Sequence, residues 1–186
     1  LAVKSKKEKK ITKAQFINLY DIIKLPIMKV FLLNPPYLKN YLRSARCTWL
    51  PISGSNWYPI FLAYTTGWLE KHGHQTKLVD APVADLSPTV VFKLAKDFQP
   101  DLLVLYISAQ SLKNDLAIGK KIKKLTNCQL VLVGPWCATE PEKLVALNPA
   151  VDAVVRREFD DVILDLAQGK PKKQIKGLIF RQGKKV

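Results

Sequence analysis

Three short stretches carry the polar groups with which this sequence could recognise a ligand. They are NPPY at 34–37, SAQS at 108–111 and GPWCA at 134–138. The first lacks the glycines of a dinucleotide-binding loop and the Gly-Lys-Ser/Thr of a phosphate-binding loop, so a nucleotide site loses its main support. The second combines hydroxyl and amide groups with small side chains, and the third begins with a glycine that leaves its backbone accessible. Each stretch alone is equally well interpreted as ordinary loop sequence.

Side chains suited to catalysis or metal binding are few. Cys137 follows a predicted strand near a helix start, a position that can lower a thiol pKa. No histidine is close in sequence to activate it, so a packing or ligand-contact role is favoured. His72 and His74 flank Gly73 at a predicted helix end, where we expect exposed turn residues. The three cysteines contain no CxxC pair, and neither a disulfide framework nor a metal site is predicted. We therefore assign no catalytic residue and no metal ligand.

Two further groups lie in predicted loops. The stretch RREFDD, Arg156 to Asp161, follows the fifth predicted strand and could face the ligand edge. A capped helix start explains the acidic residues of this stretch equally well. Three aromatic residues flank a loop that contains glycine and serine: Trp49, Trp57 and Tyr58. They are expected either to cover a flat ligand or to pin the loop to the core.

The elements that would position these groups alternate between short apolar segments and longer helical ones, as in parallel βαβ units. The predicted strands are 29–34, 76–80, 101–108, 129–134 and 151–155. The predicted helices are 58–73, 87–98, 112–126, 139–148 and 158–168. The strands are nearly continuous in valine, leucine and isoleucine, which is typical of strands covered on both faces. In such a sheet a ligand lies outside the carboxyl ends of the strands, at the switch point of strand order, where the three stretches are expected.

The charge of the chain lies mainly at its ends. The formal net charge is +15 over 186 residues, a length that suits one domain with a buried core. Residues 1–28 contain seven lysines and two acidic residues, and residues 168–186 contain six lysines, one arginine and no acidic residue. The part between them has sixteen basic and thirteen acidic residues. We interpret the basic ends as solvated extensions, although phosphate contacts could recruit them.

The chain is predicted to consist of a basic extension over 1–28, an α/β domain over 29–168 and a basic hairpin over 169–186 with Gly183 near its turn. Met28, the single methionine, is interpreted as the original start, and the residues before it as an extension or the product of an upstream start. Within them, apolar residues between positions 11 and 23 predict a short helix. No segment has the apolar length of a membrane span or of a secretory signal, and we expect a soluble, cytoplasmic protein.

The order of these segments resembles the N-terminal cobalamin-binding domain of cobalamin-dependent radical S-adenosylmethionine enzymes, over residues 29–186. Five phrases in order carry the resemblance: KVFLLNPP, YPIFLAYTTGWLEKHGHQTKLVDAP, PDLLVLYISAQS, LVLVGPWCATEPEKL and VDAVVRREFDDVILDLA. The resemblance implies a flavodoxin-like, Rossmann-type three-layer sandwich with a five-stranded parallel sheet in the order 2-1-3-4-5, followed by a C-terminal hairpin. It also implies a corrin ring over the carboxyl edge, with the nucleotide tail beside the sheet.

The resemblance further implies that cobalamin is contacted by the three loops and by two weaker positions. These residues are Asn34, Pro35, Pro36, Tyr37, Ser108, Ala109, Gln110, Ser111, Gly134, Pro135, Trp136, Cys137, Ala138, Arg156 and Glu158. The DxHxxG motif that supplies a histidine to cobalt is absent, so no protein histidine ligand is expected. Where the family commonly has Gly-Pro-His and Arg-Gly-Glu, this chain has Trp136 and Arg157. Both side chains could close the pocket, or pack on the corrin and reach its amides.

The CxxxCxxC motif that holds the family's 4Fe-4S cluster is also absent from this sequence. The cluster and S-adenosylmethionine are therefore expected only in a radical barrel supplied in cis or in trans, and this chain is not expected to be catalytic alone. It is either a fragment of a longer enzyme or a separate domain that positions the corrinoid for a methyltransferase-type partner. The alternatives are a ligand-free remnant or interaction domain with the same fold and, third, nucleic-acid binding through the basic ends.

Overall fold

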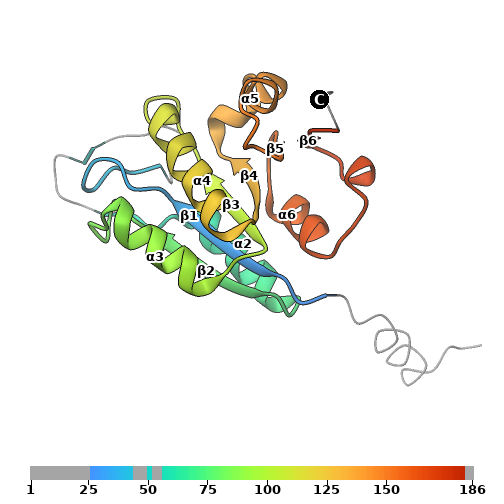
Figure 1. The fold of residues 1–186 in the computed structure, drawn as a ribbon, viewed down its shortest axis with the longest axis horizontal. Helices are drawn as coiled ribbons and strands as arrows, with labels where there is room; N and C mark the ends of the chain where they lie inside the picture. The colour runs from blue at the N-terminus through green and yellow to red at the C-terminus, as the bar shows by residue number, and fades with distance from the viewer. Residues whose placement is uncertain (1–25, 44–49, 52–55, 183–186) are drawn as a thin grey trace, which may run out of the picture.

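The computed structural model describes residues 26–43, 50–51 and 56–182. They form a six-stranded sheet in the order β2-β1-β3-β4-β5-β6, with helices on both faces (Figure 1). The strands are β1 (Lys29–Asn34), β2 (Gln75–Asp80), β3 (Leu102–Tyr106), β4 (Gln129–Val133), β5 (Ala153–Val155) and β6 (Leu178–Phe180). The helices are α2 (Ile60–Lys71), α3 (Pro88–Phe98), α4 (Leu112–Thr126), α5 (Pro141–Leu147) and α6 (Asp160–Ala167), with short 3-10 helices η1 (Pro135–Ala138) and η2 (Lys172–Gln174).

The flavodoxin-like arrangement predicted from the sequence is confirmed. Strands β1 to β5 are parallel and follow the order 2-1-3-4-5. Every residue of β3, the strand next to the switch point, is buried. This burial explains why the strands read as continuous apolar runs, since both faces of the sheet are covered. Ser87 caps α3, and its side chain accepts a hydrogen bond from the backbone N–H of Val90 at 3.4 Å.

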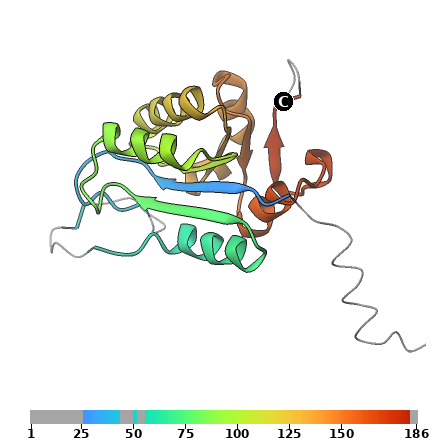
Figure 2. The same ribbon diagram turned by 60° about the horizontal axis from the view of Figure 1, so that its bottom comes forward.

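Two hydrophobic cores lie on opposite faces of the sheet, as Figure 2 shows from the positions of the helices. Successive side chains of a strand point to opposite faces. Val30 and Leu32 of β1 therefore pack in the core under α2 and α6, whereas Phe31 and Leu33 pack in the core under α3, α4 and α5. The face covered by α2 and α6 also carries the hollows at the ligand edge.

The C-terminal segment adds a sixth strand to the five that the sequence predicted. β6 pairs antiparallel with β5, with Val154 opposite Ile179, and so joins the domain's own sheet. The pairing satisfies backbone groups that would otherwise be exposed along the edge of β5. The turn expected near Gly183 and the helix expected before Met28 lie outside the described residues. Within the described residues, no helix is long and apolar enough to cross a membrane.

One of the two histidines differs from its expectation. His72 is exposed, but His74 is only 6 % exposed, and its Nδ1 accepts a hydrogen bond from the backbone N–H of Met28 at 3.3 Å. Burial lowers the pKa of His74 because it disfavours the charged imidazolium. The ring is enclosed because β2 begins directly after it and runs beside β1. Both histidines lie at the amino edge of the sheet, opposite the predicted ligand edge.

Candidate functional site

The predicted ligand loops follow β1, β3, β4 and β5, whose carboxyl ends share one edge because these strands are parallel. The structure divides this carboxyl edge into two regions. The closed half consists of the segments that follow β1 and β3, residues 35–43 and 107–111. The open half consists of the segments that follow β4 and β5, residues 134–138 and 156–159. Polar contacts dominate the first region, and an apolar groove dominates the second.

A buried arginine that the sequence did not single out is the centre of the closed half. Arg43 is fully buried, and its Nη1 donates to Asn34 Oδ1 at 2.7 Å and to the carbonyl of Pro35 at 2.8 Å. Its Nη2 donates to Asp115 Oδ1 at 2.9 Å and to Ser111 Oγ at 3.0 Å. The planar guanidinium thus joins the end of β1 to the start of α4.

Asp115 completes this ion pair from the first turn of α4. Its Oδ2 accepts hydrogen bonds from Ser111 Oγ at 2.6 Å and from the backbone N–H of Ser108 at 3.3 Å. Burial raises the pKa of the Asp115 carboxyl, while the positive charge of Arg43 and the hydrogen bond from Ser111 oppose that shift. A charge pair at zero exposure needs such additional hydrogen bonds to compensate for lost hydration.

The network reaches the surface through Tyr41. Its hydroxyl lies 3.2 Å from Ser108 Oγ and donates to Gln110 Oε1 at 3.4 Å, and Gln110 is exposed. The Arg43 guanidinium carbon lies 4.8 Å from the centre of the Tyr41 ring, a cation–π arrangement. Tyr37 packs on Tyr41 edge to face, with their ring centres 4.9 Å apart. Gln110, together with the exposed Tyr37, therefore forms the outer surface of the closed half.

The switch point between β1 and β3 is filled by this network. Asn34 donates from Nδ2 to Asp80 Oδ1 at 2.7 Å, which also joins the end of β1 to that of β2. A small void lined by Asn34, Arg43 and Tyr106 has no room for a water molecule. Three predicted contact residues, Asn34, Ser108 and Ser111, are thus buried in internal hydrogen bonds. Ala109 is exposed, and Pro35 and Pro36 are buried.

The open half contains a groove of about 350 Å³. Its lining residues are Phe61, Tyr106, Gly134, Pro135, Ala138, Arg156, Arg157, Glu158 and Phe159. The rings of Tyr106 and Phe159 meet edge to face with centres 6.2 Å apart and form part of its apolar lining. Burial raises the pKa of the Tyr106 phenol, so this group stays neutral. Charged side chains from the loop after β5 complete the lining of the groove.

Gly134 holds the end of β4 in a conformation that other residues rarely adopt. Its φ is +116°, and a Cβ added there would lie 2.8 Å from the Ile107 carbonyl oxygen and 3.3 Å from the Tyr106 ring. The contact with a backbone oxygen leaves little freedom to relax. Glycine therefore lets the ends of β3 and β4 lie close together while the groove stays open beside them.

Trp136 and Cys137 do not line this groove. Trp136 packs against the core under α3, α4 and α5, so its indole does not close the open half. Cys137 is fully buried, and burial raises the pKa of its thiol, the opposite of the lowering that a nearby helix start suggested. Arg156 Nη2 lies 2.8 Å from Glu142 Oε1, whereas Arg157 is exposed beside the groove. Cys137 thus packs the core and is no activated nucleophile.

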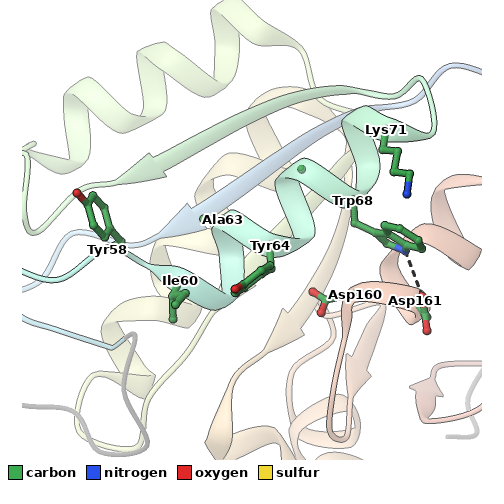
Figure 3. Close-up of a pocket in the computed structure, with 9 residues that line it drawn as sticks. Tyr58, Ile60, Ala63, Tyr64, Trp68, Lys71, Asp160 and Asp161 are labelled. Atoms are coloured by element: carbon green, nitrogen blue, oxygen red, sulfur yellow. Dashed lines mark hydrogen bonds between the residues drawn. The ribbon is translucent and has the colours of Figure 1, made fainter.

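A second groove, of about 650 Å³, lies between α2 and α6 (Figure 3). Its lining residues are Tyr58, Ile60, Ala63, Tyr64, Gly67, Trp68, Lys71, Asp160 and Asp161. Trp68 Nε1 donates to Asp161 Oδ1 at 3.1 Å, and Lys71 Nζ lies 5.0 Å from the centre of the Trp68 ring. The residues next in sequence to Ile60 and Asp160 line the open half, so the two grooves adjoin. Tyr64, which is exposed, and Trp68, which is half-buried, are aromatic residues one helical turn apart, a spacing that was a signal for this groove in the sequence.

No group of three histidine, cysteine or acidic residues suited to a metal ion occurs in the described ranges. A bound group would instead be recognised by the apolar lining of the grooves and by backbone and polar atoms at their rims. Nothing in this geometry activates a nucleophile, and the arrangement is that of a binding site.

Comparisons with known proteins show the family and the fold of this chain. Residues 52–167 match the family model of the B12 binding domain. The uncharacterized methyltransferase PH0819 of Pyrococcus horikoshii is 27 % identical over 167 residues, which cover 87 % of this chain and 34 % of that protein. This chain thus spans about a third of the length of its curated relative.

Two solved structures share the fold. The radical S-adenosylmethionine methyltransferase TsrM from Kitasatospora setae, with cobalamin and a 4Fe-4S cluster bound, has a TM-score of 0.64 and 18 % identity over 86 % of this chain and 30 % of its own. The cobalamin-dependent S-adenosylmethionine radical enzyme OxsB, with aqua-cobalamin and S-adenosylmethionine bound, has a TM-score of 0.69 and 15 % identity over 91 % of this chain and 22 % of its own. Because the B12 binding domain model matches well over half of its residues, this chain belongs to the B12-binding domain family.

Proposed function

We propose that this chain holds a cobalamin across the open half of the carboxyl edge and presents it to a radical S-adenosylmethionine module outside the chain. The observation that supports the proposal is the groove at the ends of β3, β4 and β5 in a member of the B12-binding family. The bound cofactor would supply the group-transfer chemistry through its cobalt. The protein's own residues would bind it, orient it and exclude water from one of its faces.

The lining of the open half fits a flat, amide-bearing macrocycle. The rings of Phe61 and Phe159 offer apolar surface, and the backbone at Gly134 lies open to close approach. The Arg157 guanidinium and the Glu158 carboxylate at the rim can donate to and accept from amide groups. A groove of about 350 Å³ is too small to enclose a corrinoid, so the ring would rest on this surface with its outer face uncovered. An uncovered face suits delivery to a second module.

The adjoining groove between α2 and α6 would take the nucleotide tail, which the family resemblance implies beside the sheet. Tyr64 and Trp68 present aromatic surface for a planar base, and Lys71 lies at the far end of the same groove. Its volume of about 650 Å³ suits a ligand portion of drug-like size. The contact of Thr65 with Asp160 crosses between the helices and would limit how deeply the tail enters.

The proposal includes a cobalt without a protein histidine ligand. Both histidines of the sequence, His72 and His74, lie at the amino edge, away from the groove of the open half, and the His72 ring packs on Trp68 at the far end of the second groove. It also includes a partner, in cis or in trans, that carries the 4Fe-4S cluster and S-adenosylmethionine. The share of the relative that this chain covers, 34 %, supports such a partner. A cluster of this kind needs a reducing compartment, which supports a cytoplasmic location.

Direct binding tests the proposal. The 186-residue protein is mixed with hydroxocobalamin, and the visible spectrum is recorded after gel filtration. We expect retained cofactor with an affinity on the order of micromolar or tighter. Ala138→Trp should abolish retention because an indole would fill the open half, whereas Ala117→Trp, a matched change of an exposed alanine on α4, should leave it intact. Equal retention by both variants would count against this site.

Loss of binding in the natural sequence would point to the alternative, a ligand-free domain that keeps the fold. The variant that combines Trp136→His with Arg157→Gly restores the residues that the family commonly carries. If only this variant retained hydroxocobalamin, the natural chain would be a remnant. Because Trp136 packs away from the groove, we expect the natural chain to bind, and the double substitution to change its affinity by less than about tenfold.

A further inference from the structure

We propose that Arg43 and Asp115 are positioning residues that set the geometry of the ligand edge rather than the stability of the fold. The inference rests on the proposed function for the identity of the ligand, but its effect on the protein itself is measurable without any ligand. Neither residue touches the open groove. Their influence passes through the hydrogen bonds that join the segments after β1 and β3.

The buried ion pair links segments that are distant in sequence. Arg43 and Asp115 are 72 positions apart in sequence, and their contact joins the segments after β1 and β3, which the Tyr41–Ser108 and Asn114–Pro36 hydrogen bonds also bridge. The same guanidinium holds the carbonyl of Pro35 at 2.8 Å, and the same carboxylate accepts from the N–H of Ser108 at 3.3 Å. The pair therefore fixes the path of both segments where they leave the sheet.

Burial of this ion pair has a desolvation cost. Both side chains have no exposed surface, and removing two charges from water costs several kcal/mol for each ion. A well-packed apolar pair at such a place is often as stable as the ion pair or more stable. What an apolar pair lacks is direction, because only the planar fork of an arginine defines the angle and distance of each partner. Geometry is thus the distinctive contribution of this pair.

Hydrogen bonds connect the buried ion pair to the protein surface. Ser108 Oγ lies 2.7 Å from Ser111 Oγ, which contacts both members of the pair. Ser108 Oγ also lies 3.2 Å from the Tyr41 hydroxyl, and that hydroxyl donates to Gln110 Oε1 at 3.4 Å. A continuous chain of hydrogen bonds therefore runs from the buried pair to an exposed amide at the ligand edge.

The experiment replaces the pair by apolar side chains in the full chain, as Arg43→Met with Asp115→Leu. The matched control is Lys123→Met with Asp152→Leu, which removes a partly exposed ion pair at 2.5 Å between the end of α4 and the segment before β5. Each protein is measured by urea unfolding, by amide hydrogen exchange and by titration with hydroxocobalamin. Neither control residue lies at the carboxyl edge.

For Arg43→Met with Asp115→Leu we expect a folded protein whose urea midpoint is higher than that of Arg43→Met alone, because no unpaired buried charge remains, although the Pro35 carbonyl and the Ser108 N–H lose their partners. We also expect amide exchange of residues 108–111 to be about tenfold faster, and the affinity for hydroxocobalamin to be about tenfold weaker. The control pair should leave exchange at 108–111 and affinity unchanged. Arg43→Lys keeps the charge but loses the fork, so its exchange rate should lie between those of the natural protein and the apolar variant.

Unchanged exchange at residues 108–111 in a folded apolar variant would overturn the proposal and make the pair purely structural. If that variant does not fold, Tyr41→Phe decides, because it removes the hydroxyl path without touching the ion pair. Unchanged exchange at Gln110 and unchanged affinity in Tyr41→Phe would then overturn it. If the natural protein binds no hydroxocobalamin but the exchange differences appear, the proposed function fails while the positioning role stands.

Discussion

The two halves of the carboxyl edge are built on opposite principles. In the closed half, the charged atoms of Arg43 and Asp115 are fully buried and fully paired. The hydroxyl of Ser111 in the neighbouring loop is hydrogen-bonded to both side chains. In the open half, aromatic and backbone surface is left uncovered, and the charged Arg157 lies at the exposed rim. One region is fixed by its own chain, and the other leaves surface for a ligand.

The two halves differ in how well they tolerate substitution. Buried hydrogen-bonded charges have a steep cost when one partner is lost, so the closed half tolerates little change. Apolar contact is less directional, so the open half accepts side chains of different shape with smaller penalties. Arg157 accordingly lines the exposed rim of a groove that stays open, and Trp136 packs outside that groove.

The largest predicted effect is the loss of one member of the buried pair. Arg43→Met should lower the free energy of unfolding by about 3–5 kcal/mol, because it leaves the Asp115 carboxylate buried without its partner. The same substitution in the open half, Arg157→Met, should change it by no more than about 0.5 kcal/mol, since the side chain is exposed. Urea unfolding of both variants measures the difference. Equal losses would remove the distinction between the halves.

The pH dependence of Arg43→Met sharpens this prediction. Burial already raises the pKa of Asp115, and removal of Arg43 deletes the main opposing influence, so the folded-state pKa rises further. A carboxyl whose pKa is raised by folding destabilises the protein above that pKa and ceases to do so below the unfolded value, near 4. The stability deficit of the variant should therefore shrink as pH falls from neutral toward about 4, the unfolded value. A deficit that is constant over this range would contradict the assignment to Asp115.

The next effect concerns the glycine that shapes the open half. Gly134→Ala should lower the free energy of unfolding by about 2–3 kcal/mol. A Cβ there would lie 2.8 Å from the Ile107 carbonyl oxygen, and the positive φ is strained for alanine. Gly169→Ala is the matched control, since its φ of +76° is also positive but its Cβ would meet open space. It should cost only about 1 kcal/mol. Thermal or urea unfolding compares the two, and equal costs would show that the close approach does not matter.

The smallest expected effect concerns the reactivity of a cysteine thiol. Native Cys137 should react with iodoacetamide far more slowly than an unfolded thiol, because burial both excludes the reagent and raises the thiol pKa. Cys128, which is also buried with a raised pKa, should be protected in the same way and serves as the internal comparison. Mass spectrometry of the labelled peptides gives both rates. Rapid labelling of Cys137 alone would indicate that the open half unfolds locally.

Local sequence patterns carried most of the fold. The strand over 29–34 and the helix over 112–126 have the predicted bounds, because apolar periodicity and end signals act over a few residues. The segment over 101–108 was predicted too long, since its last residues leave the sheet and enter the closed half. β6 also pairs with β5, and a short apolar run in the sequence does not reveal that partner strand.

The sequence by itself determined the alternation of strands and helices and the four loops that share the carboxyl edge, since both follow from short-range pattern and from parallel strand direction. Only the tertiary structure decided which of these loops have their polar groups engaged in hydrogen bonds within the chain. Arg43 sits in a segment without periodicity, and its partner Asp115 is 72 positions away, so no local signal announces a buried ion pair. The direction of the Trp136 side chain depends in the same way on packing against a distant core. Contacts between residues far apart in sequence, rather than the propensities of neighbours, separate the closed half from the open half.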